Sequence, residues 1–128
     1  MLKSQEQRLV RLLEKLAAEC MQSAIIVEGK KDAAALSAVG VDSGFLEKTI
    51  IILNRKNSRK SLYETAELIA MEHKKTLLMF DADRKGLQLS RLFKGYLQQN
   101  GVRANTALGK TILKVAGIRH VEDLRLGL

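Results

Sequence analysis

Apolar residues in the first part of the chain recur at steps of three and four positions, which is the period of an α-helix. They are Leu9, Leu12, Leu13, Leu16 and Cys20. This stripe predicts an amphipathic helix over residues 4–21 that packs on the body of the protein. We expect residues 1–22 to form this N-terminal helix and residues 23–128 to form the main domain.

The rest of the chain alternates short continuous apolar runs with longer segments of helical period. The run at residues 49–53 is β-branched and continuous, which is typical of a strand covered on both faces. Since parallel neighbours need a helix between them, the alternation predicts an α/β fold with a four-stranded, mainly parallel sheet between helices. The expected strands are residues 24–27, 49–53, 76–80 and 102–106, and the helices after them are residues 31–39, 61–72, 85–100 and 110–116.

Acidic residues follow two of the expected strands directly: Glu28 after the first, and Asp81 and Asp83 after the third. Ligands of open parallel sheets bind beyond the carboxyl ends of the strands, where the strand order reverses. If the two strands are neighbours, the carboxylates converge, and a hard divalent cation would relieve their repulsion. One aspartate could instead cap the next helix, but a cap does not explain the whole set. We expect these three residues to be metal-binding and catalytic, with Mg²⁺ or alternatively Mn²⁺ as cofactor.

Lysine and arginine outnumber aspartate and glutamate by 22 to 14, and the net charge of +8 favours a polyanionic partner such as nucleic acid. Several cations lie beside the expected acidic site or in "NRKNSRK", residues 54–60, where they could contact phosphates. For any single cation, solubility is an equally open explanation. The candidate phosphate-binding residues are Lys30, Arg55, Lys56, Arg59, Lys60, Arg84 and Lys85.

Glycines and histidines add little to this site from sequence alone. We expect Gly29 to permit a tight turn and Gly86 to let a phosphate approach backbone amides at the start of a helix. His73 and His120 lie far apart, show no ligand spacing, and are expected at the surface.

Composition narrows the setting in which the protein works. No apolar stretch is long enough to cross a bilayer and no secretory segment opens the chain, so we expect a cytoplasmic protein. Cys20 is the only cysteine, which excludes an internal disulfide or a cysteine-based zinc site, and we expect it to be a small buried residue.

Two segments together resemble the signature motifs of the Toprim domain family, E-G-x-x-D and D-x-D-x-x-G. They are "IIVEGKKDAAAL", residues 25–36, and "LLMFDADRKG", residues 77–86. The family includes bacterial primases, type IA and type II topoisomerases, OLD-family nucleases, RecR-type recombination proteins and the ribonuclease that matures 5S ribosomal RNA. The resemblance covers residues 23–108 and looks like that of a small stand-alone member.

The resemblance implies a Rossmann-like fold and a role for each motif residue. Glu28 is similar to the family's glutamate, which acts as a general acid or base or helps to hold metal. Asp81 and Asp83 are similar to its magnesium ligands. Gly29 and Gly86 match the motif glycines, and Asp32 matches the last position of the first motif, where an acid in the first turn of a helix is also commonplace.

Other readings of the chain are weaker. No partner domain with a catalytic tyrosine, zinc ribbon or helicase-binding region is evident, so topoisomerase or primase activity of this chain alone is not expected. Tyr63 and Tyr96 fall in helical patterns and are expected to be packing residues. "ALGKT", residues 107–111, lacks the first glycine of a P-loop. A phosphoacceptor receiver domain would need paired acids after the first strand, whereas glycine and lysines follow Glu28.

The leading hypothesis is a magnesium-dependent nuclease or phosphodiesterase that acts on RNA or DNA. The alternative is a non-catalytic nucleic-acid-binding subunit of a larger RNA- or DNA-processing assembly. A protein partner or a homo-oligomer is compatible with either hypothesis, because the apolar face of the first helix could serve a partner as well as the core.

Overall fold

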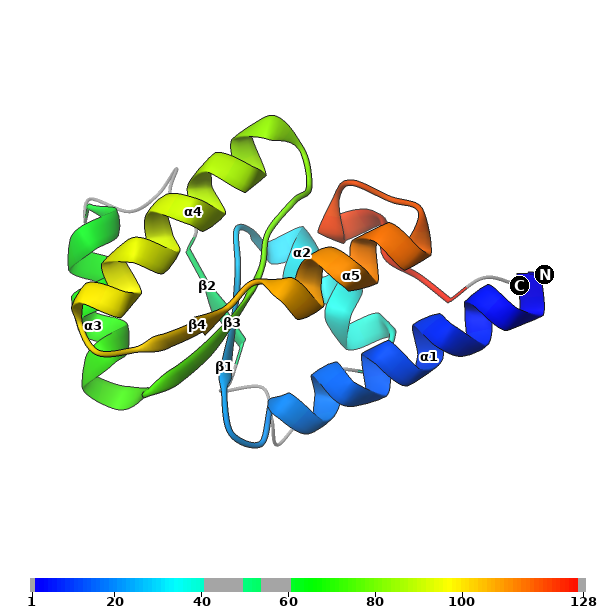
Figure 1. The fold of residues 1–128 in the computed structure, drawn as a ribbon, viewed down its shortest axis with the longest axis horizontal. Helices are drawn as coiled ribbons and strands as arrows, with labels where there is room; N and C mark the ends of the chain where they lie inside the picture. Colours follow the sequence, from blue (N-terminus) through cyan, green and yellow to red (C-terminus); the bar gives the residue numbers. More distant parts are fainter. Residues whose placement is uncertain (1, 41–49, 54–60, 127–128) are drawn as a thin grey trace.

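The structure, a computed structural model, describes residues 2–40, 50–53 and 61–126. Within these ranges strands and helices alternate after an N-terminal helix, and a short 3-10 helix follows the last α-helix (Figure 1). The α-helices are α1 (Leu2–Glu19), α2 (Lys30–Ala38), α3 (Leu62–Glu72), α4 (Arg84–Gln99) and α5 (Ala107–Ala116). The strands are β1 (Ala24–Val27), β2 (Ile50–Ile52), β3 (Lys75–Met79) and β4 (Arg103–Asn105), and the 3-10 helix is η3 (Val121–Asp123).

The four strands form one parallel sheet with the order β2-β1-β3-β4, which confirms the predicted α/β fold. β1 pairs on one side with β2 and on the other with β3, and Val27 stands opposite both Ile52 and Met79. The chain leaves β1 for one side of the sheet and then returns to the other side, so the strand order reverses at the β1–β3 pair. The crevice beyond the carboxyl ends of these two strands is therefore the favoured place for a ligand.

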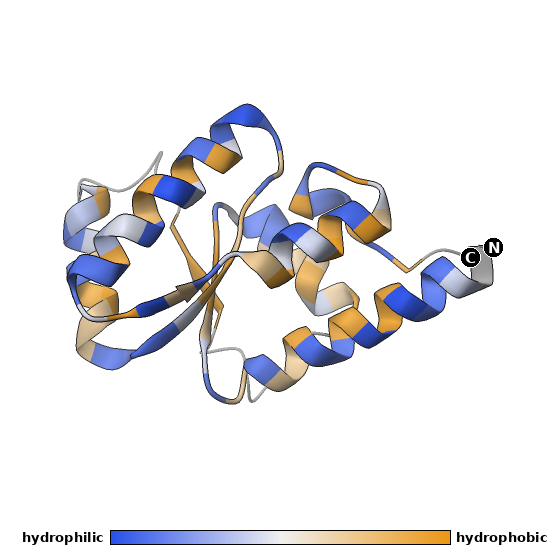
Figure 2. Cartoon of the chain, viewed as in Figure 1, coloured by the Kyte–Doolittle hydropathy of each residue, from blue (hydrophilic) through white to orange (hydrophobic). Residues whose placement is uncertain are grey.

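Helices cover both faces of the sheet, and an apolar cluster fills the space on each side (Figures 1 and 2). On one face, Ile25 and Val27 pack with α1, α2 and α5. On the other face, Ile26 packs with Ala66 and Ile69 of α3 and with the fully buried Phe93 and Leu97 of α4. Neighbouring residues of a strand point to opposite faces, which explains this division. The two clusters hold the sheet, and hence the ends of its strands, in a fixed position.

The predicted N-terminal helix is present, and its apolar stripe packs as expected. Leu9, Leu13, Leu16 and Cys20 are buried, and Leu12 is partly buried against the same cluster. Figure 1 shows α1 lying beside α5, with which it makes most of its contacts. Within the described parts of the chain, no helix has both the length and the apolar character needed to span a membrane.

The prediction that residues 49–53 are covered on both faces is wrong. β2 is an edge strand whose three isoleucines are only partly covered, and Ile52 is 36% exposed. A β-branched run reflects the preference of these residues for extended backbone, which an edge strand satisfies as well as a central one.

The last α-helix begins earlier than its apolar pattern indicates. α5 starts at Ala107, whereas the sequence predicted residue 110. The side-chain oxygen of Asn105 accepts the backbone N–H groups of Ala107 (2.9 Å) and Leu108 (3.3 Å), and so satisfies donors of the first turn.

The two tyrosines pack between α3 and α4, as predicted. The rings of Tyr63 and Tyr96 meet edge to face with centroids 5.3 Å apart. This geometry is the favoured one for two aromatic rings, and it joins the two helices that cover one face of the sheet.

Candidate metal centre at the carboxyl end of the sheet

Glu28 and Asp81 meet at the carboxyl ends of β1 and β3. The two strands are paired up to Val27 and Met79, so the residues that follow them leave the sheet side by side. The backbone N–H of Asp81 donates to Oε1 of Glu28 over 3.0 Å. The convergence that the sequence made conditional on neighbouring strands is therefore present.

Asp83 lies next to Asp81 and is the N-cap residue of α4. Its Oδ1 accepts the N–H of Gly86 over 2.8 Å, so the capping role weighed as an alternative is real. Its Oδ2 points away from this cap and lies 3.3 Å from Nε2 of His120. One carboxylate can thus cap the helix and still offer an oxygen to the site.

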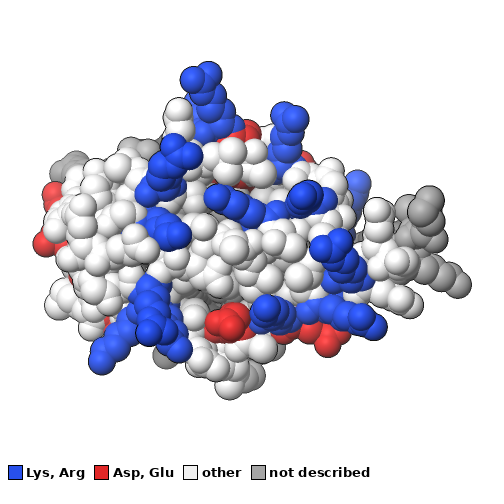
Figure 3. Space-filling model, viewed as in Figure 1, with Lys and Arg blue, Asp and Glu red and all other residues white. Residues whose placement is uncertain are grey.

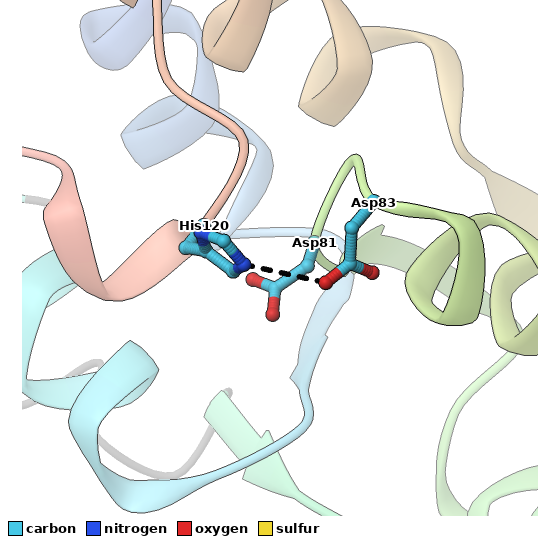
Figure 4. A group of neighbouring side chains, drawn as sticks. All are labelled: Asp81, Asp83 and His120. Atoms are coloured by element: carbon cyan, nitrogen blue, oxygen red, sulfur yellow. Dashed lines mark ion pairs between the residues drawn. The ribbon is translucent and has the colours of Figure 1, made fainter.

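His120 is the part of the site that sequence reasoning missed. It was expected at the surface without a role, and its side chain is 46% exposed, but it faces Asp81 and Asp83 (Figure 4). Its Nδ1 also lies 3.8 Å from a carboxylate oxygen of Asp123. The segment after α5 brings it there, because the N–H of Val121 donates to Oδ1 of Asp81 over 2.8 Å.

Asp32 stands behind the cluster in the first turn of α2 and is buried. Its Oδ2 accepts the N–H of Gly29 over 3.1 Å, which shapes the turn that carries Glu28. Gly29 itself has φ −146° and ψ 175°, an extended conformation that any residue adopts, and a Cβ there would touch nothing closer than 4.0 Å. Gly29 was expected to permit a tight turn, but neither its conformation nor the space around it depends on glycine.

Gly86 is required for space. A Cβ at this position would lie 2.0 Å from the backbone oxygen of Asp81, an overlap that no side-chain rotation could relieve. Its N–H is taken by Asp83, so it does not offer the amide to a phosphate that the sequence suggested. The glycine lets α4 approach β3 closely and so fixes Asp83 beside Asp81.

Three carboxyl groups at this end of the sheet have raised pKa values, chiefly because they are buried. Burial raises the pKa of Glu28 above its usual value, and the negative charge of Asp81 adds to the rise. Burial also raises the pKa of Asp32 and of Asp81, although the N–H of Val121 opposes the effect on Asp81. Carboxylates that hold protons more tightly than in water are those whose charge a bound cation would offset.

The donor set fits a divalent cation. Asp81, Asp83 and His120 each offer one ligand atom, and these atoms lie within 4.8 Å of one another. Opposite ligands of an octahedral Mg²⁺ are about 4.2 Å apart, so small side-chain rotations would gather all three around one ion. Carboxylates suit Mg²⁺ and Mn²⁺, whereas an imidazole is a better ligand for a transition metal than for Mg²⁺.

The predicted phosphate-binding cations are only partly described. Lys30 in α2, and Arg84 and Lys85 in α4, are exposed in the first turns of the helices that follow the acidic residues. Among the described residues none of the three forms an ion pair with an acid, so their charges remain available to a ligand. The other candidates lie outside the described residues: Arg55, Lys56, Arg59 and Lys60.

The fold and the site define a class of protein: a parallel α/β domain with a cluster of acidic residues where the strand order reverses. A family model described as the Toprim domain matches residues 23–112. The chain belongs to the Toprim domain family, as its two motifs indicated.

The chain is similar over most of its length to several curated proteins. It is 31% identical over 121 residues to a UPF0292 protein of Methanocaldococcus jannaschii, covering 92% of this chain and 88% of the relative. A UPF0292 protein of Pyrococcus horikoshii is 35% identical over 105 residues, with 80% and 72% covered. A solved structure of an Aquifex aeolicus protein has the same fold, with a TM-score of 0.71, 24% identity, and 89% of this chain and 95% of that chain covered. Family membership indicates a metal-dependent function related to nucleic acids.

Proposed function

We propose that this protein hydrolyses phosphodiester bonds of RNA or DNA with Mg²⁺ or Mn²⁺ held by Asp81 and Asp83. The observation that carries the proposal is the convergence of these two aspartates with Glu28 and His120 where the strand order reverses. The net charge of +8 supports a polyanionic substrate. The acidic cluster itself repels phosphate, so a bound cation would have to lie between the cluster and the substrate.

Asp81 and Asp83 are suited to hold the cation because each has one oxygen fixed by a backbone N–H. Val121 donates to Asp81, and Gly86 donates to Asp83, so both carboxylates are oriented before any ligand arrives. A bound divalent cation would neutralise charge on the phosphate and make water a better nucleophile. His120 completes the donor set and would favour Mn²⁺ over Mg²⁺.

Glu28 is suited to proton transfer. Burial raises the pKa of Glu28 above its usual value, which makes this carboxylate a stronger base than one in water. Its Oε1 is held by the N–H of Asp81, which places the group beside the proposed ligands. In this proposal Glu28 takes a proton from the attacking water or returns one to the leaving oxygen.

Lys30, Arg84 and Lys85 would contact the non-bridging oxygens of the phosphates next to the scissile bond. Contacts of this kind position the backbone without reading the bases, so the proposal includes little sequence preference and strong dependence on salt.

The direct test is incubation of the purified protein with labelled structured RNA, single-stranded DNA and duplex DNA, with Mg²⁺ or Mn²⁺. Glu28→Gln and Asp81→Asn remove charge from the site, and Glu67→Gln is the matched control because Glu67 is exposed on α3. The proposal predicts cleavage that is lost with a chelator and in both site variants, and kept in the control. Binding without cleavage of any substrate would contradict it and would favour a non-catalytic subunit.

A further inference from the structure

A cation-rich groove lies at the opposite end of the sheet from the acidic cluster. Its volume is about 340 Å³, and it forms where the starts of β3 and β4 meet the ends of α1 and α4. Its three cations are Lys75, Lys94 and Arg103, one each from β3, α4 and β4. We call this site the amino-end groove. None of these cations belongs to the set that the sequence singled out.

The positive charge of the amino-end groove is not neutralised within the described residues. None of its cations forms an ion pair there. One acid, Glu19, also lines the groove, but its carboxylate accepts the hydroxyl of Ser23 over 3.5 Å. Three cations and one acid leave the groove with a net positive charge. Lys94 is partly buried, which restricts the conformations of its side chain.

The groove also offers neutral hydrogen-bond donors. The oxygen of the Asn105 side chain is used to cap α5, so its NH₂ group is left as a donor on the wall of the groove. Gln98 lines the same wall. Cations together with amide donors are the groups that bind phosphate and sugar oxygens. Among the described residues no aromatic side chain lines the groove, so the proposed binding relies on phosphate and sugar contacts and not on base stacking.

We propose that the amino-end groove binds the phosphates of single-stranded RNA or DNA at some distance from the acidic cluster. A recess of about 340 Å³ can admit about one nucleotide of a flexible strand, whereas a duplex presents only rows of phosphates on a stiff convex surface. This inference rests on the proposed function, because the groove would bind the part of the substrate strand that lies beyond the scissile phosphate.

β3 connects the groove to the acidic cluster and sets the distance between them. Lys75 opens the strand and Asp81 follows its end, and six residues at about 3.3 Å each cover about 20 Å. A stacked strand rises about 3.4 Å per nucleotide, so about six nucleotides would span both sites. Figure 3 shows lysine and arginine side chains over α4 and α5 on the face that joins the two ends, with acidic side chains mainly along its edges.

The test measures binding of fluorescent 12-nucleotide single strands, both RNA and DNA, by anisotropy in EDTA over a range of salt concentrations. EDTA prevents metal-dependent cleavage, so binding is separated from the proposed activity. The variant Lys94→Gln/Arg103→Gln removes two cations from the groove. The matched control, Arg8→Gln/Arg125→Gln, removes two exposed cations that lie outside it.

Each phosphate contact contributes about 0.7 to the slope of log K against log salt for a single strand. We expect the groove variant to lower that slope by about 1.4 and to bind about 20-fold more weakly at about 0.1 M salt, with the control close to wild type. The loss of affinity in the groove variant should be the same for single strands of any base composition. The groove variant and the control should bind a 12-base-pair duplex with equal affinity. Lys75→Gln/Arg103→Gln, which changes only exposed residues, should reproduce the loss with an unchanged melting temperature.

Equal affinity of the groove variant and the control for single strands would overturn the inference. A groove variant that loses binding in a protein that cleaves nothing would leave the groove standing and contradict the proposed function. If the wild type cleaves nucleic acid and the groove variant binds it as tightly as the control, the proposed function stands and the inference about the groove is contradicted.

Discussion

The two ends of the parallel sheet carry opposite charge and differ in how their polar groups are arranged and hydrogen-bonded. At the carboxyl end, Glu28, Asp81 and Asp83 are crowded together, and backbone N–H groups hold one oxygen of each. At the amino end, the cations are spread around a groove, and the buried polar contact is neutral: the hydroxyl of Thr76 donates to the backbone oxygen of Arg103 over 2.9 Å.

The contrast indicates that the carboxyl end is shaped for a ligand at a cost to the stability of the metal-free protein. Burial raises the pKa of Glu28, Asp32 and Asp81, which means that their charged forms are disfavoured in the folded state. Neutralising an acid at that end should therefore stabilise the metal-free protein, whereas removing a polar group at the amino end should destabilise it.

The largest effect on stability is expected from Gly86→Ala. The new Cβ would overlap the backbone oxygen of Asp81, so α4 must move away from β3, at a cost of about 3 kcal/mol in the free energy of unfolding. Gly95→Ala is the matched control, since a Cβ there meets nothing within 4 Å, and it should stabilise α4 by about 0.5–1 kcal/mol. Urea denaturation measures both, and an equal effect of the two changes would contradict the close approach.

A smaller loss is expected from Thr76→Val, which keeps the shape of a buried side chain and removes its hydroxyl. The backbone oxygen of Arg103 loses its hydrogen bond at the β3–β4 pair, which costs about 1–2 kcal/mol. Thr111→Val removes an exposed hydroxyl that donates to Ala107, where water can replace it. If urea denaturation gives equal losses for both variants, the buried contact has no special role.

The dependence of stability on pH distinguishes the acidic end further. Because the folded-state pKa of Glu28, Asp32 and Asp81 is raised, their contribution favours the folded state most below their unfolded pKa and is lost as the pH rises through the folded pKa. In EDTA, Asp81→Asn should melt at a higher temperature than wild type at pH 7, and the difference should shrink towards pH 4. Saturating Mn²⁺ at pH 7 should reverse the order of the two proteins.

The smallest effect is expected from His120→Gln, which keeps a polar side chain and removes the imidazole. Because an imidazole favours transition metals, the variant should lose several-fold in affinity for Mn²⁺ while its affinity for Mg²⁺ changes little. Calorimetric titration with each ion measures the ratio. A His73→Gln variant serves as the control, because His73 ends α3 outside the cluster. An unchanged Mn²⁺ to Mg²⁺ ratio in His120→Gln would exclude the imidazole as a ligand.

The parallel sheet was predicted from the sequence, because apolar runs that alternate with helical segments indicate the strands of an α/β fold. The meeting of Glu28 with Asp81 was predicted only on the condition that their strands are neighbours, and the strand order meets that condition. Periodicity likewise predicted α1 and its buried face. These features depend on local pattern and on few rules of topology.

His120 could not be predicted, because its place depends on how the segment after α5 folds back onto Asp81. That return is held by hydrogen bonds between residues far apart in the sequence: the N–H of Val121 donates to the side chain of Asp81, and the N–H of Ala82 donates to the backbone oxygen of Arg119 over 2.6 Å. The space around Gly86 and the amino-end groove are also products of packing between elements distant in sequence. A histidine soon after the last helix was the only available signal, and alone it has no metal-ligand spacing.

The central claim is that the carboxyl end of β1 and β3 binds a divalent cation through Asp81 and Asp83. Calorimetric titration of Mn²⁺ into wild type, Asp81→Asn and the exposed control Glu67→Gln tests it most directly. We predict saturable binding to wild type and to the control, and a loss of at least about tenfold in affinity in Asp81→Asn. Equal binding by Asp81→Asn and wild type, or no binding by any of the three, would contradict the claim.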